Sequence, residues 1–137
     1  MWTSITTSLA VTGSDLDPAA VERALGFARP AARRPGLSVH HGPGWWALTV
    51  DAECSADLDG QIAELARLAG PHLDGIGTLA GAGCRVQVAV SGTVELGGPL
   101  TLSPESAARL AALGLPVSFT TLLPDNLPAE DPLDFLG

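Results

Sequence analysis

The sequence predicts a single α+β domain, a two-layer sandwich in which helices cover one face of a four- to five-stranded, largely antiparallel sheet. Segments that alternate apolar and polar residues, as half-buried strands do, are interspersed with segments of helical spacing. Aspartate or serine followed by proline marks two helix starts, and glycine marks the ends of both helices. With 137 residues, 46% of them hydrophobic and 16% charged, the chain can bury one core and is too apolar to be disordered.

A period of two residues predicts the strands. In the first strand Ile5 and Leu9 fall on one side, whereas Thr6 and Ser8 fall on the other. The predicted strands are residues 5–11, 45–51, 85–91 and 117–121, with a short edge strand at 99–102. Residues 27–44 contain three prolines and three glycines and are predicted to be irregular.

Caps and helical spacing predict the helices, which are residues 18–25, 58–68, 73–79 and 104–113. Residues 58–68 are the most amphipathic stretch, with leucine or isoleucine every three or four residues and Gln61 on the polar side. The pair Gly70-Pro71 interrupts this helical region. Two strand–helix–strand units joined by a helical insert, residues 58–79, would form a ferredoxin-like sandwich.

The chain divides into a domain, residues 1–123, and an acidic, proline-rich C-terminal tail, residues 124–137. The tail contains three prolines and four acids, among them Asp125 and Asp131. Without the tail 7 arginines face 11 acids, so the net charge of −8 becomes −4. The acidity therefore belongs to both parts.

Charge and cysteine content exclude several classes of function. Seven arginines and no lysine stand against 15 acids, which argues against nucleic acid or an anionic membrane as partner. No apolar run approaches the ~18 residues of a membrane span. The first residues contain no basic region followed by an apolar stretch, so no secretory signal is expected. Cys54 and Cys84 are interpreted as buried free thiols in a reducing cytoplasm.

The sequence contains no motif of a metal site, nucleotide loop or nucleophilic elbow, so no cofactor, metal or catalytic residue is expected. One alternative remains open, a small-molecule pocket or small enzyme between residues 30–44 and Trp45. His40 or His41 would then act as acid or base, and Arg33 or Arg34 would hold an anion.

The strand pattern also predicts a polar face. If helices cover one side of the sheet, the other side carries Thr6, Ser8, Trp45, Thr49, Arg85, Gln87, Ser118 and Thr120. Hydroxyls, one arginine and a large aromatic suit a ligand, a protein partner or a second copy of the chain. The candidate binding residues are Trp45, Trp46, Arg85, Gln87 and Thr120, with Asp125 and Asp131 adding charge.

Several motifs together resemble the bacterial domain-of-unknown-function family 4279, over Thr3 to Leu123. They are Gly13-Ser-Asp-Leu-Asp17-Pro18, Leu25-Gly26, Gly44-Trp45-Trp46, the central amphipathic helix and Leu113-Gly114-Leu115. The resemblance implies a small standalone bacterial protein and supplies no catalytic residues. Where relatives often carry an aromatic residue and a lysine-glycine turn, this chain has Ala31-Ala-Arg33-Arg34-Pro35, so a shared role of that loop does not carry over.

These observations favour a non-enzymatic cytoplasmic binding protein. An acidic protein with an open polar sheet face suits an inhibitor or immunity protein that recognises a basic protein partner. A homodimer through the same face and the small-molecule pocket described above are the alternatives.

Overall fold

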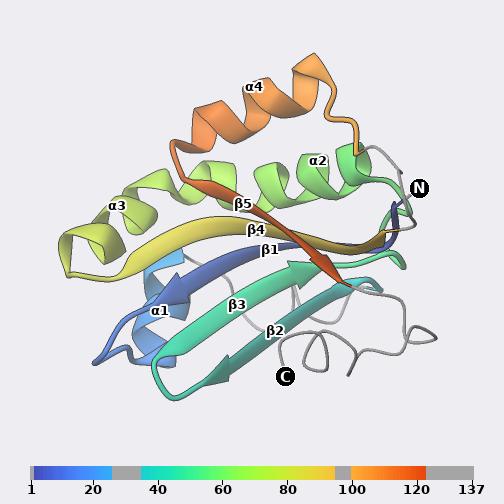
Figure 1. Cartoon of the computed structure of the whole chain (residues 1–137). Helices are drawn as coiled ribbons and strands as arrows, with labels where there is room; N and C mark the ends of the chain where they lie inside the picture. Colours follow the sequence, from blue (N-terminus) through green and yellow to red (C-terminus); the bar gives the residue numbers. More distant parts are fainter. Residues whose placement is uncertain (1, 26–34, 95–99, 123–137) are drawn as a thin grey trace, which may run out of the picture.

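The computed structural model describes residues 2–25, 35–94 and 100–122, which form one mixed five-stranded sheet in the order β2-β3-β1-β4-β5. The strands are β1 (Trp2–Thr12), β2 (Leu37–Gly42), β3 (Trp45–Val50), β4 (Arg85–Val94) and β5 (Val117–Leu122). The helices are α1 (Pro18–Leu25), α2 (Leu58–Ala69), the 3-10 turn η2 (Gly70–His72), α3 (Leu73–Gly81) and α4 (Pro104–Leu113). The described helices pack on one side of the sheet, which confirms the α+β prediction (Figure 1).

The first four strands and their crossover helices form a ferredoxin-like unit. Their order is β2-β3-β1-β4, and all three pairings are antiparallel. The helical segment expected as an insert, α2 to α3, is the second crossover of this unit. The addition is instead α4 and β5, because β5 extends the sheet by pairing in parallel with β4.

Residues 37–42 form strand β2, whereas the whole of 27–44 was expected to be irregular. Gly36, directly before the strand, and Gly44, in the turn between β2 and β3, have positive φ angles of +81° and +78°. Gly36 also lies so close to Cys54 that a Cβ would overlap its backbone. These glycines therefore allow the turns that flank β2, and they do not prevent residues 37–42 from forming a strand. Residues 100–102, part of the short edge strand predicted at 99–102, form no strand, in contrast to the prediction.

Apolar side chains of the central strands fill the space beneath the helices. Leu9, Leu48 and Val88 are fully buried and belong to one cluster with Ile62 and Leu65 of α2. Burial stabilises the fold by about 1.5–3 kcal/mol for each side chain of this size. The core formed by the described residues therefore lies between the sheet and the helices. The opposite face of the sheet is not part of this core.

A buried glutamine joins α2 to an irregularity in β1. Ser4 has a φ of +52°, and the pairing of β1 with β4 shifts register between Thr3 and Thr6. The side chain of Gln61, fully buried, donates from Nε2 to the Ile5 carbonyl at 2.7 Å and to the Ser55 carbonyl at 2.9 Å. Its Oε1 accepts a hydrogen bond from the Thr7 hydroxyl at 2.9 Å. Gln61 is thus a core residue, although helical spacing placed it on the polar side.

Replacing Gln61 by leucine is expected to lower the free energy of unfolding by roughly 2–4 kcal/mol, because buried oxygens and the Thr7 hydroxyl lose their partner. Denaturant titration measures this change. The matched control is Gln87→Leu on the opposite, half-exposed face, expected to change stability by less than about 0.5 kcal/mol. Equal effects of the two substitutions would contradict the assigned role of Gln61.

A carboxylate in the first turn of α2 anchors the start of α4. Asp59 Oδ1 accepts hydrogen bonds from the Ser106 hydroxyl at 2.6 Å and from the Ser103 backbone N–H at 3.3 Å. The Ser106 hydroxyl, followed by the Ser103 N–H, holds the pKa of Asp59 below its usual value. Ser103 is itself the N-cap of α4. The start of α4, and with it the path into β5, is therefore fastened to α2.

Replacing Asp59 by alanine is expected to lower the melting temperature at neutral pH and to have less effect in acid. A carboxyl whose pKa is lowered by folding stabilises the fold above its unfolded pKa, near 3.8, and this contribution is lost as the pH falls through the folded value. Thermal melts of both proteins from neutral pH to below that range measure the difference. The control is Asp74→Ala, which removes an acid from the first turn of α3 that has no such contact with α4. It measures the effect of losing an acid at a helix N-terminus alone. A difference that persists unchanged in acid would contradict the assignment.

Candidate functional site

The face of the sheet opposite the helices, here called the open face, collects the polar residues predicted for it. The register pairs Ser8 with both Thr49 and Ala89, and it pairs Thr6 with Ser91. Because paired residues share a face, Thr6, Ser8, Trp45, Thr49, Arg85, Gln87, Ser118 and Thr120 all lie on this side. These eight residues come from four different strands, so only the assembled sheet brings them together.

The middle of the open face is made of small side chains. One row across the five strands consists of Ser38, Thr49, Ser8, Ala89 and Ser118. The hydroxyls of Ser8 and Thr49 hydrogen-bond to each other at 2.9 Å, and those of Thr6 and Ser91 at 2.7 Å. Hydroxyls that already have partners cost less to remove from water than free ones. This surface is therefore suited to contact a flat partner closely.

A tryptophan and an arginine stand at one end of the open face. Thr12 of β1 pairs with Trp45 on one side and with Arg85 on the other, so the three form one row. Trp45 is 41% exposed, and its indole lies over Gly42, where a Cβ would overlap the ring nitrogen. Gly42 is thus required for the position of the indole. The row combines tryptophan and arginine, two of the three side-chain types in which the hot spots of protein interfaces are enriched.

Trp46 does not belong to the open face. It is fully buried on the helical side, pairs with Val11, and donates from Nε1 to a carboxylate oxygen of Glu22 in α1 at 3.5 Å. Adjacent residues of a strand point to opposite faces, so Trp45 and Trp46 cannot both contact one partner of this face. The prediction of Trp46 as a binding residue is therefore corrected to a core residue.

The two adjacent histidines are separated in the same way. Both are exposed on β2, where His40 pairs with Ala47 on the open face and His41 pairs with Trp46 on the helical side. They cannot serve one reaction centre together. Among the described residues no group of three His, Cys, Asp or Glu side chains could hold a metal ion. The other candidates, Arg33, Arg34, Asp125 and Asp131, lie outside the described residues.

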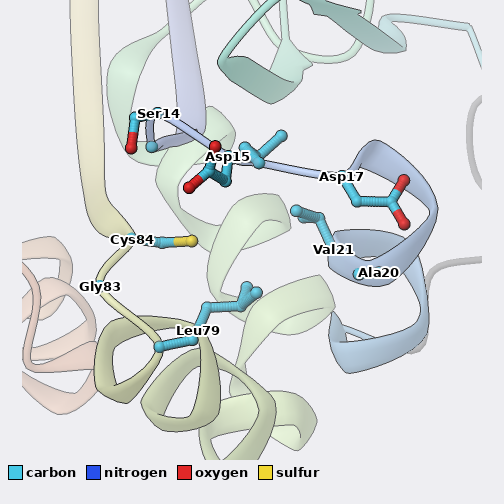
Figure 2. A pocket seen from close by; sticks show the side chains of 11 residues that line it. Ser14, Asp15, Asp17, Ala20, Val21, Leu79, Gly83 and Cys84 are labelled. Carbon is cyan, nitrogen blue, oxygen red and sulfur yellow. The ribbon is translucent and has the colours of Figure 1, made fainter.

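A pocket of about 310 Å³ lies elsewhere, at the turn between β1 and α1 (Figure 2). Its walls come from residues 13–17, from α1 and from the turn between α3 and β4. Cys84 directs its thiol into the pocket, and Asp15 places its carboxylate above it, while Val21 and Leu79 supply apolar walls. Sequence reasoning missed this pocket, because the segments that form it are about 70 residues apart.

Both cysteines are free thiols, as expected, but each is half-buried instead of buried. Cys84 lies at the start of β4 beside the pocket, and Gly13 approaches it closely. Cys54 follows β3 and packs against Gly36.

One family matches the chain, and its description is "Domain of unknown function (DUF4279)", over residues 3–123. The chain belongs to the DUF4279 family. The match runs from β1 to the end of β5, so α4 and β5 are part of the DUF4279 domain and not an attachment to it. Neither the curated proteins nor the solved structures contain a match to this chain.

Proposed function

We propose that this DUF4279 protein is a non-enzymatic binding protein of the bacterial cytoplasm that recognises another protein through the open face. The observation that carries the proposal is the composition of that face. Small hydroxylated side chains fill its middle, and the exposed Trp45 and Arg85 stand at its end. Interface centres are depleted of lysine and acidic residues and enriched in aromatic residues and arginine, and Trp45 and Arg85 supply these two enriched types here.

The charge of the chain favours a basic partner. The net charge is −8, and Arg85 is the one basic residue among those predicted for the open face. Acidic proteins attract basic ones over several ångströms, which raises the association rate at low salt. Inhibitors and immunity proteins act by covering a partner in this way and need no catalytic group of their own. No helix among the described residues combines the length and apolar character needed to cross a bilayer.

Two double variants test the proposal. Trp45→Ala with Arg85→Ala removes the end row of the open face, whereas Leu73→Ala with Arg109→Ala removes an exposed apolar residue and an arginine from the helical layer. A partner captured by the wild-type protein and identified by mass spectrometry is purified, and its affinity for each variant is measured by calorimetry. We expect the first variant to bind at least about tenfold more weakly, and the second to bind like wild type.

Association should also slow as salt is added, because surface charges are screened beyond about 10 Å at ~0.1 M ionic strength. Unchanged affinity of the open-face variant would refute the role of this face. An equal loss of affinity in the open-face variant and in the helical-layer variant would also refute it.

The pocket beside Cys84 favours a second candidate, the binding of a small molecule. Apolar walls together with the carboxylates of Asp15 and Asp17 suit a compound with an apolar body and a cationic group. This site is separate from the location predicted between residues 30–44 and Trp45. Of that predicted location, residues 37–42 form β2 and residues 30–34 lie outside the described part of the chain.

Filling the pocket tests this candidate. Ala20→Phe places a ring in the pocket, and Ala19→Phe places one on the exposed side of the same helix. Small amines with apolar groups should shift the amide resonances of residues 13–17 in wild type and in the Ala19 variant but not in the Ala20 variant. Absence of any shift in wild type would reject the pocket as a site for this class of ligand.

A further inference from the structure

Strand β5 ends the sheet, and within the described part of the chain no strand pairs with its outer edge. Residues 117–122, Val-Ser-Phe-Thr-Thr-Leu, contain no charged residue, no proline and no glycine. The pairing of β5 with β4 continues without a bulge over its whole length. Edge strands usually carry such features, which prevent pairing with another chain. β5 is therefore able to accept one more strand.

The direction of the main-chain groups shows which residues would pair. Val88 donates its N–H to the Pro116 carbonyl at 2.9 Å and is aligned with Val117. Successive residues of a strand direct their main-chain groups to opposite sides, so the even-numbered residues of β5 face β4. The odd-numbered residues, Val117, Phe119 and Thr121, therefore direct their N–H and C=O groups outward.

Phe119 stands in the middle of these outward-directed residues. Its side chain is aligned with that of the buried Val90, on the helical side of the sheet, yet it is 48% exposed. It is the most exposed of the large apolar side chains described. A strand added beside β5 would cover the ring.

We propose that the protein forms a homodimer by antiparallel pairing of β5 with β5 of a second copy, centred on Phe119. A two-fold axis through Phe119 pairs Phe119 with Phe119, Val117 with Thr121, and Ser118 with Thr120. Aromatic residues then meet aromatic ones, β-branched residues meet β-branched ones, and hydroxyls meet hydroxyls, combinations that stabilise antiparallel pairs.

The register follows from the main-chain groups. With the axis at Phe119, three pairs of outward-directed residues each exchange two hydrogen bonds. With the axis at Thr120, only two such pairs form within residues 117–122, because Val117 then lies opposite residue 123. An axis placed between two adjacent residues would pair a side chain of the open face with one of the helical side. A two-fold axis normal to the sheet does not allow this, because it keeps each side chain on its own face. The pairing centred on Phe119 therefore makes the most hydrogen bonds.

This dimer is independent of the proposed function. It leaves Trp45 and Arg85 uncovered on each copy. Three strands separate Trp45 of β3 from the seam, and one strand, β5, separates Arg85 of β4 from it. Both open faces would lie on the same side of one continuous sheet, because the two-fold axis is normal to it. A partner with two binding sites would then be held by both copies at once.

Sedimentation velocity over a range of concentrations tests the dimer, with Phe119→Asp as the variant and Leu73→Asp as its match. Leu73 is 40% exposed on α3, so both substitutions place a carboxylate on a similarly exposed apolar site. We expect wild type and the Leu73 variant to dimerise, and the Phe119 variant to dimerise at least about tenfold more weakly, because like charges meet across the pair.

A second variant tests the backbone contact itself. Thr121→Pro removes one outward N–H and leaves the hydrogen bonds to β4 in place, so it should weaken the dimer while thermal melts show a folded monomer. Amide exchange gives the most specific signal. In the monomer the amides of Val117, Phe119 and Thr121 exchange quickly and those of Ser118 and Thr120 slowly, and dimerisation should protect the first group. A wild-type protein that stays monomeric at millimolar concentration would overturn the proposal, as would a dimer that Phe119→Asp leaves unchanged.

Discussion

The hydrogen bonds of Gln61 are the constraint on which the rest of the structure depends. β1 is the central strand of the sheet, and both β3 and β4 take their register from it. A shift of one residue in a strand moves every side chain to the other face. The irregularity near Ser4 creates such a shift within β1. Gln61 forms hydrogen bonds with the Ile5 carbonyl inside the shifted segment and with the Thr7 hydroxyl just beyond it. The buried amide thus keeps Thr7 on the helical side and Thr6 and Ser8 on the open face.

Two unlike faces follow from this register. The helical side receives the large apolar side chains of β1, β3 and β4 together with Trp46. The open face receives serines, threonines and alanines, which are too small to form a core but allow another surface to approach closely. Asp59 extends the arrangement, because it fastens α4 to α2 and α4 leads into β5.

Local patterns were sufficient to predict most elements. Caps and terminal glycines predicted the bounds of α1 and α4, and alternation predicted β1, β3, β4 and β5 to within a few residues. β2 was missed, because its glycine- and proline-rich flanks are typical of loops and its pairing with β3 is a tertiary contact. Gln61 was assigned to the polar side of its helix for a related reason. Its hydrogen-bond partners Ile5 and Thr7 lie more than 50 residues away, and no local pattern reports them.

The candidate site was predictable in outline and not in detail. Alternation alone grouped residues of four strands on one face, and the register places all eight of them there. The same alternation excludes Trp46, whose neighbour Trp45 occupies the open face. The position of Trp45 over Gly42 and the pocket at Cys84 depend on the hairpin and on the packing of α3, so neither could be derived from spacing.

The most direct measurement places a large charged side chain at the centre of the open face. Ala10 is half-exposed on β1, between Ala47 and Gln87, and Ala10→Arg would hold a flat partner away from the whole face. We expect the variant to fold like wild type by circular dichroism and to fail to bind the purified partner in calorimetry. A folded variant that binds the partner with wild-type affinity would refute recognition through the open face, because the partner would then contact a different surface.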